Sequence, residues 1–191
     1  LPTSKGALGE FGGRNAPTTL NAGFHIAQFW DGRAKDVEEQ AGMPILNPIE
    51  MAIPSEEFLV ERLSKIEGYR TAFAEAFPDE EPALTYRNIQ RALGAFERTL
   101  ISGDSAYDRW VYRDQRWAMD EPARRGMRLF FSQRLACFEC HSGFNFADND
   151  FHNLGVGILK KDPDLGRFDV VVVSAPAPQA GELLGTCSPD L

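Results

Sequence analysis

The residues with the most distinctive chemistry are Cys137, Cys140 and His141, which form a Cys-x-x-Cys-His motif. Two thiols at this spacing can form thioethers with the two vinyl groups of one haem, and the histidine that follows can bind the haem iron. The motif therefore predicts that the chain carries one covalently attached haem of the c type.

Two other uses of the Cys-x-x-Cys pair fit the sequence less well. A structural zinc ion takes four ligands, and no second Cys-x-x-Cys or His-x₃₋₅-His pair accompanies this one. A thioredoxin-like redox pair needs a βαβ setting, which the helical surroundings of the motif do not provide. The third cysteine, Cys187, stands alone in a loop-like sequence and is assigned no role.

The elements that must position this motif are predicted to be mainly helical. Ser55, Thr85 and Asp120 are expected to cap helices, because each precedes apolar residues at helical spacing. Gly42 and Pro44 are expected to end the first helix, since proline removes a helical hydrogen bond. The predicted helices are residues 36–41, a helix after Ser55, residues 69–77, a helix after Thr85, residues 105–117 and a helix after Asp120. Residues 170–173 are predicted as a short strand.

The helix after Thr85 has the strongest apolar pattern of the chain. Its stripe is predicted to pack into the core and consists of Ile89, Leu93, Phe96 and Leu100. The turn-forming sequence at residues 102–104 follows this helix. We therefore expect a domain boundary there, which divides the chain into residues 1–102 and 103–191.

The composition excludes several classes of protein. With 191 residues, of which 43% are hydrophobic, the chain can build a globular core. Its net charge of −8 and its scattered basic residues argue against nucleic-acid binding. No apolar run is long enough to span a membrane, and the first residues lack the charged and apolar regions of a signal peptide.

The chain resembles the bacterial di-haem cytochrome c peroxidases and the MauG-like branch of that family. The resemblance extends from residue 1 to about residue 168, and its motifs occur in the family's order. They are RNAPT (14–18), FWDGRA (29–34), EEQA (38–41), NPIEM (47–51), FERTL (96–100), CFECH (137–141) and FHNLG (151–155). Together these motifs imply an incomplete form of the two-domain architecture, built from cytochrome c-like domains.

The resemblance implies two unequal parts. Residues 1–102 are similar to the peroxidatic side, whose own haem motif would precede residue 1. Residues 103–191 are similar to the electron-transfer haem domain and are expected to be truncated at the C-terminal end. The sixth ligand of that haem iron is expected beyond residue 191, because Met119 and Met127 precede the motif and are poor substitutes.

Four further residues have roles that only the resemblance implies. Trp30 would lie between the two haems, and Gln40 and Glu50 would face the peroxide side of the second haem. Asn15 would bind an inter-domain calcium ion through a hard oxygen ligand. Taken from their types alone, Trp30 is a core residue, Glu50 is a solvated loop acid, and Gln40 and Asn15 are ordinary helix-surface and turn residues.

The function that the resemblance implies is reduction of hydrogen peroxide to water. The electrons would come from a small cytochrome c or a cupredoxin, in the periplasm, and a homodimer is compatible with the family. His152 is expected to support the haem pocket without binding iron. Ala7 stands where many family members carry a histidine that blocks the peroxidatic iron, so a MauG-like enzyme that oxidises a partner protein stays open. A mono-haem electron carrier is the other alternative.

Overall fold

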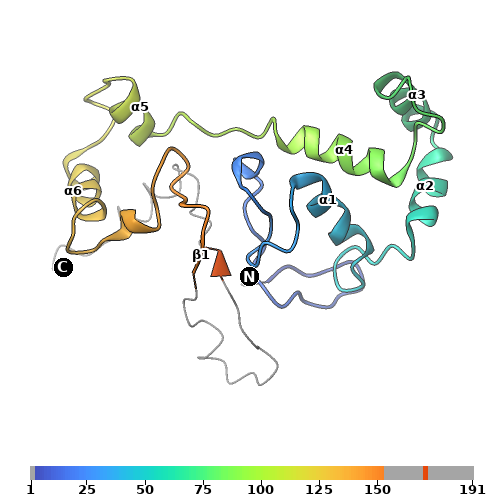
Figure 1. Ribbon diagram of the computed structural model, residues 1–191, viewed down its shortest axis with the longest axis horizontal. Coiled ribbons are helices and arrows are strands. Elements are labelled where there is room, and N and C mark those ends of the chain that lie inside the picture. Colours follow the sequence, from blue (N-terminus) through green and yellow to red (C-terminus); the bar gives the residue numbers. More distant parts are fainter. Residues whose placement is uncertain (1–2, 153–169, 172–191) are drawn as a thin grey trace.

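The computed structural model describes residues 3–152 and 170–171, and within them the chain is mainly helical, as predicted (Figure 1). Two short 3₁₀ turns and two two-residue strands complete the described elements. In chain order they are η1 (Ala22–Phe24), α1 (Val37–Leu46), α2 (Glu56–Ser64), α3 (Glu67–Ala76), α4 (Tyr86–Glu97), α5 (Ala106–Tyr112), α6 (Glu121–Phe130), η2 (Cys137–Glu139), β1 (Phe151–His152) and β2 (Val170–Val171).

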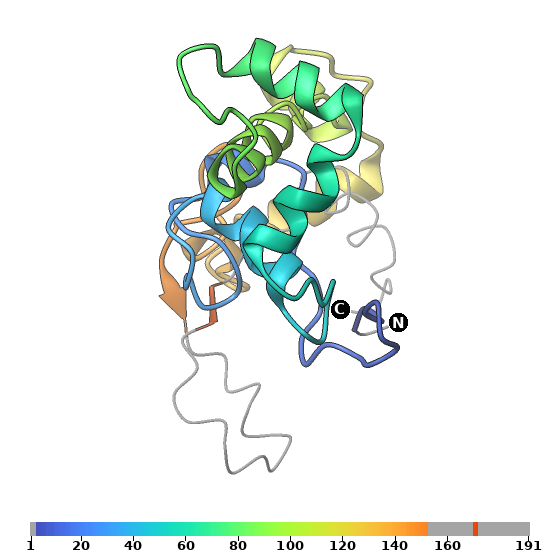
Figure 2. The ribbon, with the colours of Figure 1, turned by 90° about the vertical axis from the view of Figure 1, so that its right-hand side faces the viewer.

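The main hydrophobic core lies among the first four α-helices. Its buried members are Ile45, Leu59, Phe73, Leu84 and Ile89. Helix α1 packs along α4, while α2 and α3 lie together at one end of α4 (Figures 1 and 2). Helices α5 and α6 lie beyond the other end of α4, and a long extended segment leads to them (Figure 1).

Side-chain caps define where most of the helices begin. Ser55, Thr85 and Asp120 each accept a hydrogen bond from the backbone N–H three residues later, as predicted. Asp36 caps α1 in the same way. Ser105 and Asp108 form a reciprocal capping box at the start of α5. These polar contacts satisfy backbone donors that would otherwise have no partner within the helix.

Helix α1 continues to Leu46, so the prediction that Gly42 and Pro44 end it is wrong. Its packing against α4 explains the difference. The Tyr86 hydroxyl donates a hydrogen bond of 2.7 Å to the Gly42 carbonyl oxygen, and a Cβ at Gly42 would lie 2.2 Å from Gln90 Nε2. The glycine thus permits close approach of two helices, and this tertiary contact outweighs the local cost of proline.

An ion pair joins the same two helices. Arg98, which follows the last residue of α4, donates hydrogen bonds to both carboxylate oxygens of Glu38, one of them at 2.8 Å. These bonds from Arg98 hold the pKa of the Glu38 carboxyl below its ordinary value. Gly94 leaves room for this carboxylate, since a Cβ there would lie 2.8 Å from Glu38 Cδ. The EEQA and FERTL motifs therefore meet in space.

The predicted apolar stripe of α4 is only partly buried. Ile89 is 6% exposed, but Leu93 is 39% and Phe96 is 61% exposed among the described residues. The helix predicted for residues 105–117 ends at Tyr112, and Trp117 is 81% exposed. The prediction that the whole stripe packs into the core is therefore wrong at Leu93 and Phe96. Helical spacing places these residues on one face of the helix but does not show what covers that face.

Asn21 fastens the segment between α4 and α5 to the N-terminal part of the chain. Its side-chain amide donates to the Ser102 carbonyl oxygen at 2.9 Å and accepts from the Ser102 N–H at 2.8 Å. Its own N–H donates to the Leu100 carbonyl oxygen at 2.9 Å. Asn21 is 7% exposed, so these bonds satisfy a buried amide. The domain division after residue 102 stays a prediction.

The two strands form a small antiparallel pair near the haem motif. Phe151 is paired with Val171 and His152 with Val170. The strand predicted at residues 170–173 is therefore described at its first two positions, and residues 172–173 lie outside the described residues. No helix in the described part of the chain is both long enough and apolar enough to cross a membrane.

Candidate functional site

The Cys-x-x-Cys-His motif forms one compact helical turn. Cys137 begins the 3₁₀ turn η2, and the His141 N–H donates to the Cys137 carbonyl oxygen at 2.9 Å. Cys140 directly follows this turn, three residues after Cys137. Both thiols are free rather than joined in a disulfide. The turn therefore presents two sulfur nucleophiles and one imidazole within five residues.

The imidazole of His141 is held at one of its two ring nitrogens. Nδ1 lies 3.2 Å from the Phe146 carbonyl oxygen, which can only accept a hydrogen bond. This contact assigns the proton to Nδ1 and leaves the lone pair on Nε2. Proteins usually orient a metal-binding histidine through a hydrogen bond from the ring nitrogen that does not bind the metal, often to a backbone carbonyl. His141 is thus prepared to bind a metal through Nε2.

Aromatic side chains surround this histidine. The Phe130 ring lies 6.2 Å from the imidazole and 5.6 Å from the Phe146 ring, measured between centroids. Tyr107 lies 5.1 Å from Phe146 and stacks on Phe131 at 6.4 Å. Burial raises the pKa of the Tyr107 hydroxyl above its ordinary value. Helices α5 and α6 thereby supply an apolar wall beside the motif.

The described residues fit a haem because they leave apolar surface around the motif uncovered. Helix α6 ends at Phe130, shortly before the motif, and contributes no buried residue. Leu135 is 52% exposed and Phe144 is 64% exposed among the described residues. A flat apolar macrocycle attached at Cys137 and Cys140 would remove such surface from water, which is favourable. Free thiols, an oriented imidazole and an apolar surround are the three features that such a group needs.

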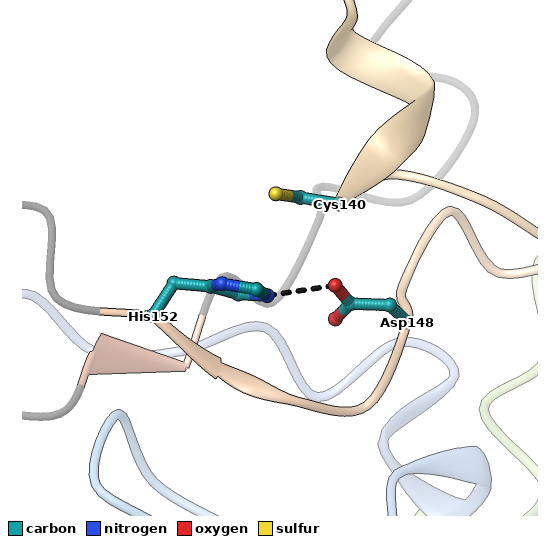
Figure 3. A group of neighbouring side chains, drawn as sticks. All are labelled: Cys140, Asp148 and His152. Atoms are coloured by element: carbon teal, nitrogen blue, oxygen red, sulfur yellow. Dashed lines mark hydrogen bonds and ion pairs between the residues drawn. The ribbon is translucent and has the colours of Figure 1, made fainter.

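A second group of metal-binding atoms lies beside the motif. The ligand atoms of Cys140, Asp148 and His152 all lie within 4.8 Å of one another (Figure 3). His152 Nε2 and Asp148 Oδ2 are 2.7 Å apart, and the Asp148 N–H donates to the Cys140 carbonyl oxygen at 3.1 Å. The sequence pointed to His152 but not to Asp148, which reads only as a turn residue. The spacing of four residues between them was the available signal.

The charge of Asp148 is favoured where it lies. The Asp150 N–H donates to Asp148 Oδ1 at 2.9 Å, and this bond lowers the pKa of the Asp148 carboxyl below its ordinary value. The hydrogen bond from His152 acts in the same direction. An ionised carboxylate therefore lies next to the Cys140 sulfur.

The structure brings two further predicted residues, Trp30 and Asn15, into contact. The Trp30 indole N–H donates to the Asn15 carbonyl oxygen at 2.7 Å. Asp31 accepts hydrogen bonds from Arg14 at 2.9 Å and from Arg33 at 2.8 Å. Burial opposes ionisation of Asp31, but these two guanidinium groups outweigh it and keep the pKa of the carboxyl below its ordinary value. The RNAPT and FWDGRA motifs are thus one hydrogen-bonded unit.

The predicted peroxide-side residues lie where the chain folds back on α1. The Ala7 N–H donates to the Glu50 carbonyl oxygen at 2.7 Å. The Met51 N–H donates to the carbonyl oxygen of Pro44 at 3.1 Å, one helical turn after Gln40. Glu50 is half-buried rather than fully solvated. Ala7, Glu50 and the C-terminal half of α1 therefore belong to one local structure, and the roles of Gln40 and Glu50 stay predictions.

Two aromatic contacts connect this N-terminal part to the segment after the motif. The Phe151 ring lies over Gly32, where a Cβ would be 2.2 Å from Phe151 Cζ. Phe24 meets Phe144 edge to face, with 5.1 Å between the ring centroids. The loop that carries Trp30 is therefore packed directly against the segment that follows His141.

With this arrangement established, comparison with known proteins identifies the family. The family model described as di-haem cytochrome c peroxidase matches residues 1–116. The chain belongs to the di-haem cytochrome c peroxidase family. The predicted family and fold class are therefore confirmed, and the family implies haem c as the cofactor.

Individual relatives come from both branches of the family. The methylamine utilization protein MauG of Methylophilus methylotrophus is 42% identical over 155 residues, which are 81% of this chain and 44% of that protein. The cytochrome c peroxidase Ccp of Escherichia coli is 39% identical, over 88% of this chain and 36% of that protein. The chain thus spans less than half the length of these curated relatives.

A solved structure has the same arrangement of elements. The crystal structure of a MauG-like protein associated with microbial copper homeostasis superposes with a TM-score of 0.78 at 25% identity. The match covers 96% of this chain and 60% of that structure. The cytochrome c-like fold of the described chain is therefore that of its family.

The contact between Gly32 and Phe151 predicts a specific sensitivity. Gly32 has a φ of +65°, and an alanine there would also collide with the Phe151 ring. We expect Gly32→Ala to lower the free energy of unfolding by about 1–3 kcal/mol, measured by urea denaturation. Gly13→Ala is the matched control, since no heavy atom lies within 4 Å of a Cβ at that position.

The double variant Gly32→Ala/Phe151→Ala separates the two causes. It removes the collision with the Phe151 ring and leaves only the backbone strain at position 32. In a double-mutant cycle, Gly32→Ala should therefore lower the free energy of unfolding less when Phe151 is already alanine. Equal effects of Gly32→Ala and Gly13→Ala would show that the loop of Trp30 is not packed against Phe151.

Proposed function

We propose that this chain is the central part of a periplasmic di-haem peroxidase that reduces hydrogen peroxide to water. Cys137, Cys140 and His141 would hold its electron-transfer haem, and the electron donor would be a small cytochrome c or a cupredoxin. The observation that carries this proposal is the His141 geometry: its Nδ1 is engaged by a backbone carbonyl within a turn that also presents two free thiols. The family match supports the reaction class.

The residues of this chain hold the electron-transfer haem. Cys137 and Cys140 would attach the macrocycle through thioether bonds, and His141 would bind the iron through Nε2. When bound, haem supplies one-electron chemistry with a reduction potential set by its ligands and surroundings. Phe130 lies beside the imidazole and Phe146 packs against Phe130, so these rings would reduce the contact of a bound haem with water on this side.

Trp30 is proposed to lie between this haem and the second one. The support is its loop, which packs against the segment after His141 through Gly32 and Phe151. The hydrogen bond from the indole N–H to Asn15 fixes the plane of the ring. The indole is thereby held where the N-terminal part of the chain meets the segment after His141. Asn15 is also proposed to bind a calcium ion, and this proposal rests only on the resemblance to the family.

Glu50 is proposed to move the proton during peroxide cleavage. Breaking the O–O bond heterolytically requires a proton to pass from one oxygen to the other, and a positioned carboxylate can carry it. The Ala7 and Met51 backbone contacts hold the loop of Glu50 in place. Gln40 is proposed to position the peroxide beside it by hydrogen bonding.

Ala7 favours a second candidate function within the same family. Its N–H holds the Glu50 carbonyl, and its methyl side chain cannot bind iron, so this position offers no blocking ligand. A MauG-like enzyme that oxidises a partner protein has the same requirement. A peroxide-reduction assay on the complete protein, with and without prior reduction, tests this: activity independent of prior reduction agrees with an ungated site, and strict dependence contradicts it.

Haem attachment gives the most direct test of this chain itself. Expressed with a haem-ligation system, the 191-residue chain is expected to carry one haem, measured by the pyridine-haemochrome spectrum against protein concentration. The variant Cys137→Ser/Cys140→Ser should carry none, because both thioether sites are lost. Cys187→Ser is the matched control and should keep one. Two haems on the chain, or none, would contradict the proposal.

The proposed proton carrier predicts a large kinetic effect in the complete protein. Glu50→Gln keeps the shape of the side chain but cannot exchange a proton, so kcat for peroxide should fall about 10²–10⁴-fold. Glu75→Gln, an exposed position on α3, should leave kcat unchanged. Loss of activity of similar size in both variants would remove Glu50 from the mechanism.

A further inference from the structure

Cys140, Asp148 and His152 form a group of metal ligands that the proposed peroxidase chemistry does not use. They comprise one thiol, one carboxylate and one imidazole, and their ligand atoms lie within 4.8 Å of one another. Among the described residues this is the one such group of three or more His, Cys, Asp or Glu side chains. All three come from 13 consecutive residues around the turn and β1 (Figure 3).

We propose that the chain, before haem is attached, binds a divalent ion of the zinc class at Cys140, Asp148 and His152. A thiolate and an imidazole are ligands that favour zinc and cobalt over calcium or magnesium. Three protein ligands leave the fourth tetrahedral position to water, as in open zinc sites. The site uses the sulfur that haem attachment also needs, so zinc and haem exclude each other at Cys140.

Zinc binding would require only small movements of the three ligand atoms from their present positions. Bond lengths of about 2.0–2.3 Å and tetrahedral angles place zinc ligand atoms about 3.3–3.6 Å apart. His152 Nε2 and Asp148 Oδ2 are 2.7 Å apart and would separate by less than about 1 Å. The Cys140 sulfur lies within 4.8 Å of the other two ligand atoms and would move about 1 Å toward them. Rotations about side-chain bonds can supply both movements.

Local contacts already hold the three ligands together. The Asp148 N–H donates to the Cys140 carbonyl oxygen, which keeps the intervening loop closed. The Asp148 carboxylate and His152 are each only partly exposed, at 20% and 32% of their side-chain surface. Cys137 is not a member of the group, and its Sγ lies 3.8 Å from the Leu135 carbonyl oxygen instead. The site therefore differs from a zinc site built on both thiols of the motif.

Haem attachment removes this site because it changes the sulfur. The Cys140 S–H adds across a vinyl C=C bond: sulfur bonds to one carbon, the proton passes to the other, and no oxidant or reductant is consumed. The product is a thioether, which carries no negative charge and binds zinc far more weakly than a thiolate. This exclusion rests on the proposed function, whereas the metal site itself does not.

Cobalt titration of the 191-residue chain produced without haem ligation tests the site. One equivalent of Co²⁺ should give a thiolate-to-cobalt charge-transfer band, and Zn²⁺ should displace it. Cys140→Ser should abolish the band. His152→Ala and Asp148→Ala should each weaken binding at least about tenfold, since even outer-shell partners of metal ligands are worth about 10–100-fold.

Two controls keep the result specific. Cys137→Ser removes the neighbouring thiol and Asp150→Ala removes an exposed carboxylate, and both should bind Co²⁺ as the unaltered chain does. Absence of the band, equal loss in Cys137→Ser and Cys140→Ser, or unchanged affinity in His152→Ala would each overturn the site. Circular dichroism of every variant identifies any that lose their helices.

The haem-loaded chain gives the remaining measurement. It should show no charge-transfer band, because Cys140 is then a thioether. A band of full strength in the haem-loaded chain would overturn the exclusion. A chain that binds cobalt but never acquires haem would instead contradict the proposed function while leaving the metal site standing, so the two failures are distinguishable.

Discussion

The hydrogen bond between His141 Nδ1 and the Phe146 carbonyl oxygen is the constraint on which the functional account depends. An imidazole binds iron through a nitrogen that carries a lone pair, and a hydrogen bond at the other nitrogen fixes this tautomer and the orientation of the ring. The loop after the motif fixes the ring because its backbone returns to His141 at Phe146. Phe146 is itself held in place, since it is only 9% exposed and lies among the aromatic rings of α5 and α6. Without that return, the turn would present the ring in many orientations.

The same loop also packs against the N-terminal part of the chain. Phe144 and Phe151 lie on either side of Phe146 in sequence, and both contact the N-terminal part, at Phe24 and at Gly32. One short segment therefore orients the histidine and receives the loop of Trp30. The arrangement explains why motifs far apart in sequence form a connected structure.

The sequence predicted the features that depend on local chemistry. The helix caps Ser55, Thr85 and Asp120, the haem motif and the mainly helical fold all follow from side-chain types and short spacings. What it missed depends on tertiary contacts. Helix α1 passes through Pro44 because Gly42 packs under Tyr86, which no local rule contains. Asp148 joins Cys140 and His152 only because the loop closes on the Cys140 carbonyl.

The central claim is that both thiols of the motif hold one haem beside the oriented His141. Tryptic digestion of the haem-loaded chain should release residues 135–160, which contain Cys137 and Cys140 but not Cys187. Mass spectrometry of this peptide gives the most direct answer. The peptide should have its mass increased by one haem, with no thiol left to alkylate. An unmodified peptide with two free thiols, after expression with a working haem-ligation system, would contradict it.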